Sequence, residues 1–65
     1  MTEFYSECMD KVIEQVNWWY KIGKIETIDK EAVEEAIEVA LTEDEAWECY
    51  QEIGADFASD CLTRM

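Results

Sequence analysis

The stretch LTEDEAWECYQEIGADFASDCLTRM, residues 41–65, decides the fold, because it reads as one long helix with two chemically opposite faces. On a helical wheel with about 100° between successive residues, its apolar side chains gather on one broad side and form a packing face. The other side carries carboxylates about one turn apart, with no Lys or Arg among them. This acidic column consists of Glu45, Glu48, Glu52, Asp56 and Asp60.

The start of this helix is marked by Thr42 and Glu45, which have the spacing of a capping box. The sequence therefore predicts a helix over about residues 43–64. Gly54 falls inside it, where glycine costs about 1 kcal/mol relative to alanine. We interpret Gly54, Ala58 and Cys61 as a strip of small residues that lets another helix approach closely, within the monomer or across a two-fold axis.

A second amphipathic helix is expected over about residues 2–22. Its apolar face covers about 180° of the wheel, wider than the stripe of about 100° that one core requires, so part of it is left over. Gly23 suits a left-handed cap at the end of this helix. On its opposite side, carboxylates with i, i+4, i+7, i+11 spacing fall within about 60° of one another. This second acidic column consists of Glu3, Glu7, Asp10 and Glu14.

A third helix is expected over about residues 30–41, with Asp29 as its N-cap and a hydrophobic staple between Ile28 and Val33. The connections on either side of it are short, which favours antiparallel neighbours. The sequence therefore predicts an all-α fold, a small three-helix up-down-up bundle in a single domain over residues 1–65. The leftover apolar face of the helix over residues 2–22 means that the bundle could also pair as a homodimer.

The composition restricts the class of partner. The chain has 65 residues, with 17 acidic and 5 basic side chains and a formal net charge of -12. This charge disfavours direct contact with nucleic acid or with an anionic membrane, and it favours a basic protein partner. There is no basic segment followed by an apolar run at the start, and no apolar stretch of membrane-spanning length. We therefore expect a soluble cytoplasmic protein.

The aromatic residues and cysteines are expected mainly in the core. Trp18 is the exception, because on the wheel it lies beside Glu14 and Lys21; it would be exposed, folded over the Lys21 stem, or covered by a second subunit. The expected core aromatics are Trp19, Tyr20, Trp47, Tyr50 and Phe57. The cysteines are three in number and lack CxxC spacing, which indicates reduced core thiols and no disulfide framework.

The sequence offers little for catalysis or for metal binding. It has no His, no EF-hand loop, no phosphate-binding glycine loop and no nucleophile elbow. Carboxylates on solvent-facing helix surfaces hold divalent ions only loosely without a cage. We therefore expect no enzyme activity, no catalytic residues, no cofactor and no metal site.

The acidic columns require an explanation, because like charges at i, i+4 cost an isolated helix about 0.2 to 0.5 kcal/mol per pair. Summed over the chain, these pairs would cost on the order of 2 kcal/mol. The carboxylates could simply keep a small, aggregation-prone protein soluble. Alternatively, two columns side by side would give about one charge per 2.7 Å, comparable to the one per about 1.7 Å of a nucleic acid duplex.

The sequence therefore predicts an acidic nucleic-acid mimic that occludes the basic nucleic-acid-binding cleft of a nuclease, restriction, CRISPR, repair or transcription protein. In charge and size the chain is similar to small acidic phage inhibitors of such machinery, a likeness of composition and not of motifs. The alternative is a small helical protein–protein interaction or dimerisation module that binds through Tyr5, Met9, Ile13 or Tyr20. The expected partner-binding residues of the mimic are Glu3, Glu7, Asp10, Glu14, Trp18, Glu45, Glu48, Glu52 and Asp56.

Overall fold

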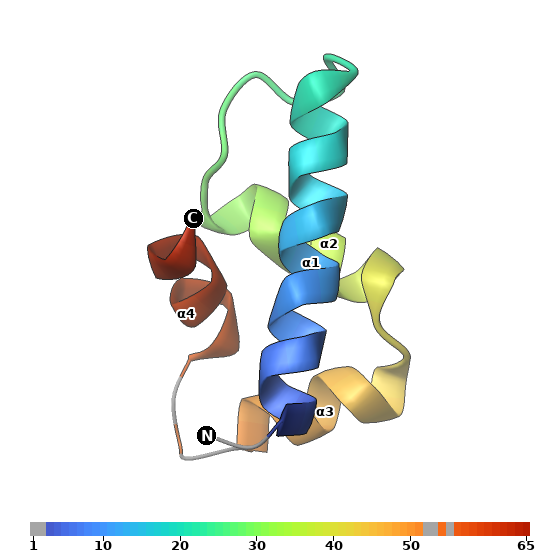
Figure 1. The fold of residues 1–65 in the computed structure, drawn as a ribbon, viewed down its shortest axis with the longest axis vertical. Coiled ribbons are helices and arrows are strands. Elements are labelled where there is room, and N and C mark those ends of the chain that lie inside the picture. Colours follow the sequence, from blue (N-terminus) through green and yellow to red (C-terminus); the bar gives the residue numbers. More distant parts are fainter. Residues whose placement is uncertain (1–2, 52–53, 55) are drawn as a thin grey trace.

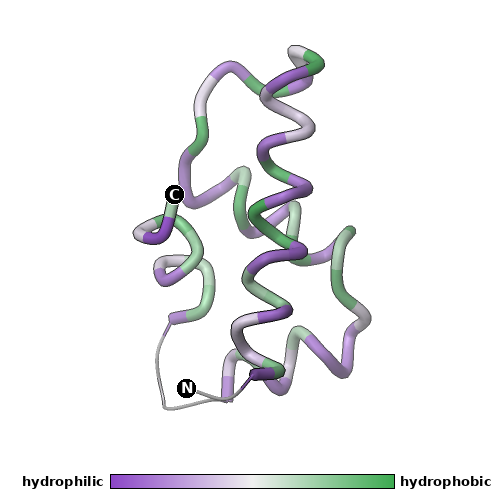
Figure 2. Tube along the Cα trace, viewed as in Figure 1, coloured by the Kyte–Doolittle hydropathy of each residue, from purple (hydrophilic) through white to green (hydrophobic). Residues whose placement is uncertain are grey.

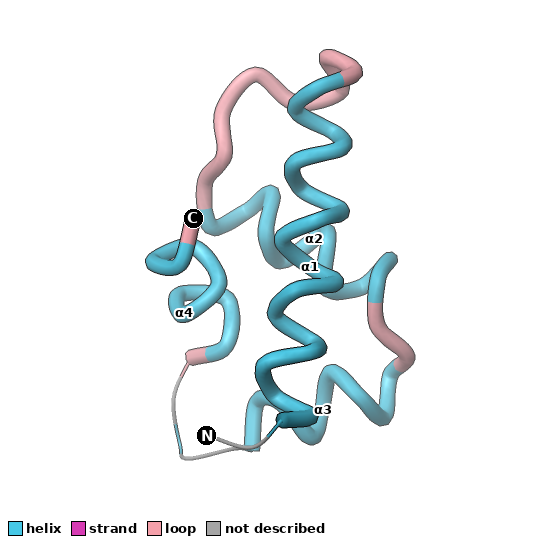
Figure 3. Tube along the Cα trace, viewed as in Figure 1, coloured by secondary structure: helices cyan, strands magenta, loops and turns pink. Residues whose placement is uncertain are grey.

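The computed structural model describes residues 3–51, 54 and 56–65, and this part of the chain consists of helices joined by loops, without a strand (Figure 3). The predicted all-α class is confirmed, but the predicted number of three helices is wrong, because four are present. In chain order these are α1 (Glu3–Lys21), α2 (Lys30–Ala40), α3 (Glu43–Gln51) and α4 (Phe57–Arg64) (Figure 1). None of the described helices combines the length and the apolarity needed to cross a bilayer.

The two longest helices, α1 and α2, pack on each other, and both contact α3 and α4. The buried side chains of α1 recur every three or four residues along one face and contact all three other helices: Tyr5, Cys8, Met9, Val12, Val16 and Trp19. In Figure 1, α2 lies behind α1, α3 crosses near the beginning of α1, and α4 lies to one side. Figure 2 shows hydrophobic residues alternating with hydrophilic ones in short steps along α1 and α2, as expected for helices with a single buried face.

The end of α1 follows from a glycine in the left-handed conformation. Gly23 has a φ of 81°, its N–H donates to the Tyr20 carbonyl at 3.2 Å, and the Lys24 N–H donates to the Trp19 carbonyl at 2.9 Å. This pair of bonds is a Schellman motif, which satisfies carbonyls that the helix itself leaves unpaired. The predicted left-handed cap at Gly23 is therefore confirmed.

The starts of α2 and α3 also follow from local side-chain bonds. The Asp29 carboxylate accepts from the Ala32 N–H at 2.9 Å, which confirms it as the N-cap of α2. Thr42 and Glu45 form the predicted capping box: the Thr42 N–H donates to Glu45 Oε1 at 3.0 Å, and the Glu45 N–H donates to Thr42 Oγ1 at 3.2 Å. These short-range bonds start α2 and α3 at the predicted residues, Lys30 and Glu43.

The single helix predicted over residues 43–64 is wrong, because the chain breaks between α3 and α4. Gly54 has a φ of 65°, a conformation that glycine adopts without strain and that ends a right-handed helix. Asp56 then caps α4, and its carboxylate accepts from the N–H groups of Ala58 and Ser59 at 3.1 and 3.4 Å. Gly54 therefore ends one helix and Asp56 begins the next, so Gly54 does not share a helix face with Ala58 and Cys61 as predicted. Glu52, Ile53 and Ala55 lie outside the described residues.

Three predicted core aromatics are on the surface, and two of them, Trp47 and Tyr50, belong to α3, just before the break. Trp47, Tyr20 and Tyr50 are 66, 53 and 41% exposed, whereas Trp19 and Phe57 are buried as predicted. On one continuous helix Trp47 would share a face with Phe57, but α3 ends before it can present that face to the core. Within α3, Cys49 is the residue that is fully buried, and Trp47 lies about 160° around the helix from it.

Candidate partner-binding surface

The outward face of α1 carries the acidic column that the spacing predicts. Glu3, Glu7, Asp10 and Glu14 are all exposed, and on the helical wheel their mean direction lies about 180° from that of the buried residues. With a rise of about 1.5 Å per residue, the column from Glu3 to Glu14 is about 16 Å long. Among the described residues, Asp10 is the member of this column that forms an ion pair.

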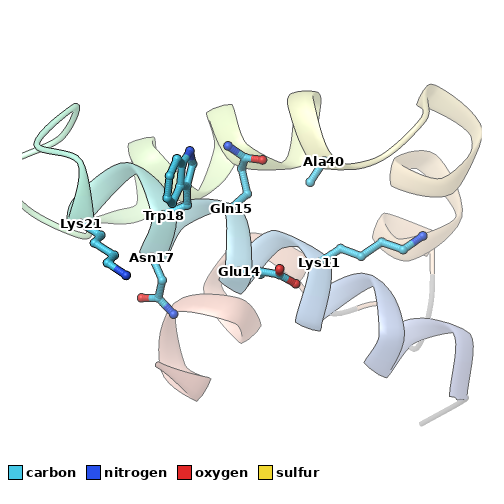
Figure 4. Close-up of a pocket in the computed structure, with 7 residues that line it drawn as sticks. All are labelled: Lys11, Glu14, Gln15, Asn17, Trp18, Lys21 and Ala40. Carbon is cyan, nitrogen blue, oxygen red and sulfur yellow. The ribbon is translucent and has the colours of Figure 1, made fainter.

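Trp18 extends this column by one further turn. Its side chain is 54% exposed, which is one of the alternatives that the sequence left open. An open groove of about 660 Å³ surrounds it, lined by Lys11, Glu14, Gln15, Asn17, Trp18, Lys21 and Ala40. In Figure 4 the Trp18 ring stands beside Gln15, whereas Asn17 and Lys21 point away from the ring. We call Glu3, Glu7, Asp10, Glu14 and Trp18 together the α1 strip.

The other predicted acidic column is interrupted by the break between α3 and α4, and three of its described members, Glu45, Asp56 and Asp60, bind partners within the molecule. Glu45 belongs to the capping box and lies 3.4 Å from Lys11 Nζ. The pKa of the Glu45 carboxyl is lowered, mainly by the hydrogen bond that it accepts from the Thr42 backbone N–H and to a smaller extent by Lys11. Glu48 is exposed on α3, whereas Glu52 lies outside the described residues.

Asp56 is likewise occupied within the molecule. Its carboxylate lies 2.6 Å from Lys30 Nζ in addition to capping α4. The hydrogen bond from Lys30, with that from the Ser59 backbone, lowers the pKa of Asp56. Both side chains of this pair are about half exposed, so solvent screens the attraction. Asp56 is therefore a structural residue at the start of α4, and it is not in line with the α1 strip.

A third ion pair connects α4 to the α1 strip. Arg64 Nη2 lies 3.7 Å from Asp10 Oδ1, and Arg64 Nη1 lies 3.4 Å from Ser6 Oγ. These distances are long and the partners are exposed, so the contact neutralises Asp10 only partly. Three of the five cations, Lys11, Lys30 and Arg64, thus pair with carboxylates on other helices or at their caps.

A row of carboxylates on α2 was not included among the predicted binding residues. Its members are all exposed and lie about 180° from the buried side of α2: Glu31, Glu34, Glu35 and Glu38. Because α1 and α2 pack against each other with α2 behind α1 in Figure 1, this row and the α1 strip point to opposite sides of the molecule. The sequence signal that could have identified this row is the i, i+4 spacing of its carboxylates, Glu31 with Glu35 and Glu34 with Glu38.

The apolar surface required by the rival interaction module is largely absent. Tyr5 and Met9 are 0 and 3% exposed, Ile13 is half-buried, and Tyr20 is exposed. The Tyr5 hydroxyl donates to Asp60 Oδ2 at 2.5 Å, which ties α1 to α4. Most of the wide apolar face of α1 is therefore covered by α2, α3 and α4, and its exposed part is at the end of the helix, at Tyr20 and Ile22.

The cysteines converge in the core without forming a reactive site. Cys8, Cys49 and Cys61 are free and buried, as predicted for reduced core thiols, and they come from α1, α3 and α4. Burial raises the pKa of Cys49 and of Cys61 to about 12, which keeps both thiols protonated at neutral pH. Within residues 3–51, 54 and 56–65, no three Cys, Asp or Glu side chains are placed to hold a metal ion together.

Comparison with known proteins gives no assignment, since no protein-family model, no curated protein and no solved structure matches this chain significantly.

Proposed function

We propose that this protein is an acidic nucleic-acid mimic of the phage-inhibitor type that acts in the cytoplasm, where its α1 strip occludes the basic cleft of a nucleic-acid-binding protein. The observation that carries the proposal is the outward face of α1. It holds four exposed carboxylates in line, followed by an exposed tryptophan. A basic cleft that grips phosphates offers complementary charge to such a row.

The charge spacing favours imitation of one strand over imitation of a duplex. The four carboxylates of the α1 strip are spread over about 16 Å, or about one charge per 5 Å of helix axis. A duplex has one charge per about 1.7 Å of axis and each of its strands one per about 3.4 Å. With the α2 row on the opposite side of the molecule, no second row among the described residues lies beside the α1 strip to double the density.

Trp18 supports the same assignment. Clefts for single-stranded nucleic acid combine cations that follow the backbone with aromatic side chains on which bases stack. At the end of the α1 strip, the exposed Trp18 ring could take the place of one stacked base. Lys21 and Lys24 lie just beyond it, near the end of α1, so the acidic part of the strip is confined to residues 3–14.

Solubility is the competing explanation, and it makes no distinction between the two faces of the molecule. Under that explanation the α2 row and the α1 strip are equivalent, because each holds four exposed carboxylates. Under mimicry the α1 strip alone determines binding. The chain thus contains its own matched control, in which the same charge is removed from the opposite side.

The experiment is capture of partners from host lysate at low salt, followed by a competition assay with each captured protein. A fluorescently labelled single-stranded oligonucleotide is bound to the partner, and the protein is titrated in. Competitive displacement of the oligonucleotide, weakened at high salt, is the expected result. Formation of a ternary complex, in which oligonucleotide and protein bind the partner together, would contradict occlusion.

A further inference from the structure

The outer face of α3 is a second unusual surface, separate from the α1 strip. Trp47 is the most exposed aromatic side chain in the described part of the chain, at 66%. It points away from the core, since Cys49 lies about 160° around the helix. We define the α3 outer face as the exposed residues on this side, Glu43, Asp44, Trp47, Tyr50 and Gln51.

The arrangement on this face is acidic at one end and aromatic at the other. Glu43 and Asp44 lie one turn before Trp47, and Tyr50 lies about one turn after it. Tyr50 is fixed by an edge-on contact with the buried Phe57, with ring centroids 6.1 Å apart and planes at 76°. Within the described residues, Glu43 and Asp44 form no ion pair. The face therefore presents aromatic surface beside unneutralised carboxylates.

This aromatic surface has no evident role in folding. Trp47 and Tyr50 leave much of their ring area in water in a chain whose core is small. Exposed apolar patches with polar rims mark interaction sites, and Trp and Tyr are the residues most enriched at binding hot spots. The tight anchoring of Tyr50 on Phe57 lowers the entropy lost when a partner covers it.

The charges around the face determine what can cover it. A second copy would bring Glu43 and Asp44 against carboxylates of another chain with the same net charge of -12, which opposes pairing. A cationic side chain would instead be attracted both to these carboxylates and to the face of the Trp47 ring. The chain contains one example of this chemistry, because Lys24 Nζ lies 4.4 Å from the centroid of the Trp19 ring.

We propose that the α3 outer face docks a basic amphipathic helix of a partner protein, with a Lys or Arg of that helix over the Trp47 ring and between Glu43 and Asp44. Apolar side chains of the same helix cover Tyr50. This docking site uses a different helix from the α1 strip, and it does not depend on the nucleic-acid mimicry proposed above.

The test uses a synthetic amphipathic helix of about five turns with Leu on one face and Lys on the other. Its dissociation constant is measured by titration against the protein, against Trp47→Ala and against Tyr20→Ala. The last variant is the matched control, because Tyr20 is also exposed, at 53%, lies outside the α1 strip and the α3 outer face, and leaves the net charge unchanged. Far-ultraviolet circular dichroism checks that both variants fold.

The expected result is that Trp47→Ala weakens binding by about tenfold or more, whereas Tyr20→Ala changes it by less than about twofold. A second pair repeats the comparison with charge: Glu43→Gln with Asp44→Asn should weaken binding more than Glu31→Gln with Glu35→Gln. If the two aromatic variants lose the same affinity, or if the two charge variants do, the proposal is overturned. Binding would then not depend on the α3 outer face. Self-association in sedimentation that Trp47→Ala abolishes would also overturn the proposal, in favour of a second copy.

Discussion

Replacing Gly54 with alanine should destabilise the protein, because Gly54 has a φ of 65° and marks the break between α3 and α4. An L-residue in this conformation costs about 1 to 2 kcal/mol. A Cβ added at Gly54 meets no atom within 4 Å, so the cost comes from the backbone conformation alone. In a continuous helix through residue 54, the same substitution would stabilise by about 1 kcal/mol. The two arrangements therefore predict effects of opposite sign.

The assay is urea unfolding followed by far-ultraviolet circular dichroism, which gives the free energy of unfolding and the helix content. Gly23→Ala is the matched control, because Gly23 has a φ of 81° and a Cβ added there likewise meets no atom within 4 Å. Both variants should lose about 1 kcal/mol, which lowers the melting temperature of a domain this size by about 4 to 8 °C. A D-alanine at position 54, introduced by chemical synthesis, should be tolerated without this loss. A stabilised, more helical Gly54→Ala variant would refute the break.

Three further predictions concern contacts between helices. Asp56→Ala should lower the melting temperature more than Asp56→Asn, since asparagine keeps the cap of α4 and loses only the contact with Lys30. The stability advantage of wild type over Asp56→Asn should be present above about pH 4 and vanish as pH falls through the lowered pKa of Asp56, measured by unfolding at each pH. Tyr5→Phe should cost about 1 to 2 kcal/mol in urea unfolding by removing the bond to Asp60. In the Asp60→Ala background, which lacks the acceptor, Tyr5→Phe should cost much less, and an equal cost there would contradict the pairing.

Local signals in the sequence were sufficient for most helix boundaries. The Gly23 cap, the Asp29 cap and the Thr42–Glu45 capping box all close hydrogen bonds within five residues of one another, so the surrounding fold hardly affects them. These signals predicted α1, α2 and the start of α3 correctly.

The break after α3 was missed because two of its signals were ambiguous. Gly54 is compatible with a close helix crossing as well as with a left-handed turn, and Asp56 suits an exposed helix position as well as an N-cap. The periodicity on either side happens to continue in phase, which concealed the interruption. Burial of Trp47 was then predicted from a helix that does not exist, and its exposure follows from the break.

The candidate site was only partly predictable, because charge pairing between helices depends on how they pack. Lys11 and Glu45 are 34 residues apart in sequence, and Lys30 and Asp56 are 26 apart. No local pattern reveals such partners. The column on α1 was predictable because its exposure follows from being opposite the core, whereas its isolation from the α2 row required the three-dimensional arrangement.

The most direct test of the proposed function removes equal charge from the two opposite faces. One variant carries Gln or Asn at the four acidic residues of the α1 strip, and the other carries Gln at the four of the α2 row. Both should fold at least as well as wild type, because each relieves like-charge i, i+4 pairs. The dissociation constant for the captured partner is then measured at low salt. We predict that the α1 variant binds at least about tenfold more weakly and that the α2 variant binds like wild type. Equal weakening of the two variants would contradict a docking role for the α1 strip and would leave the carboxylates a role in solubility alone.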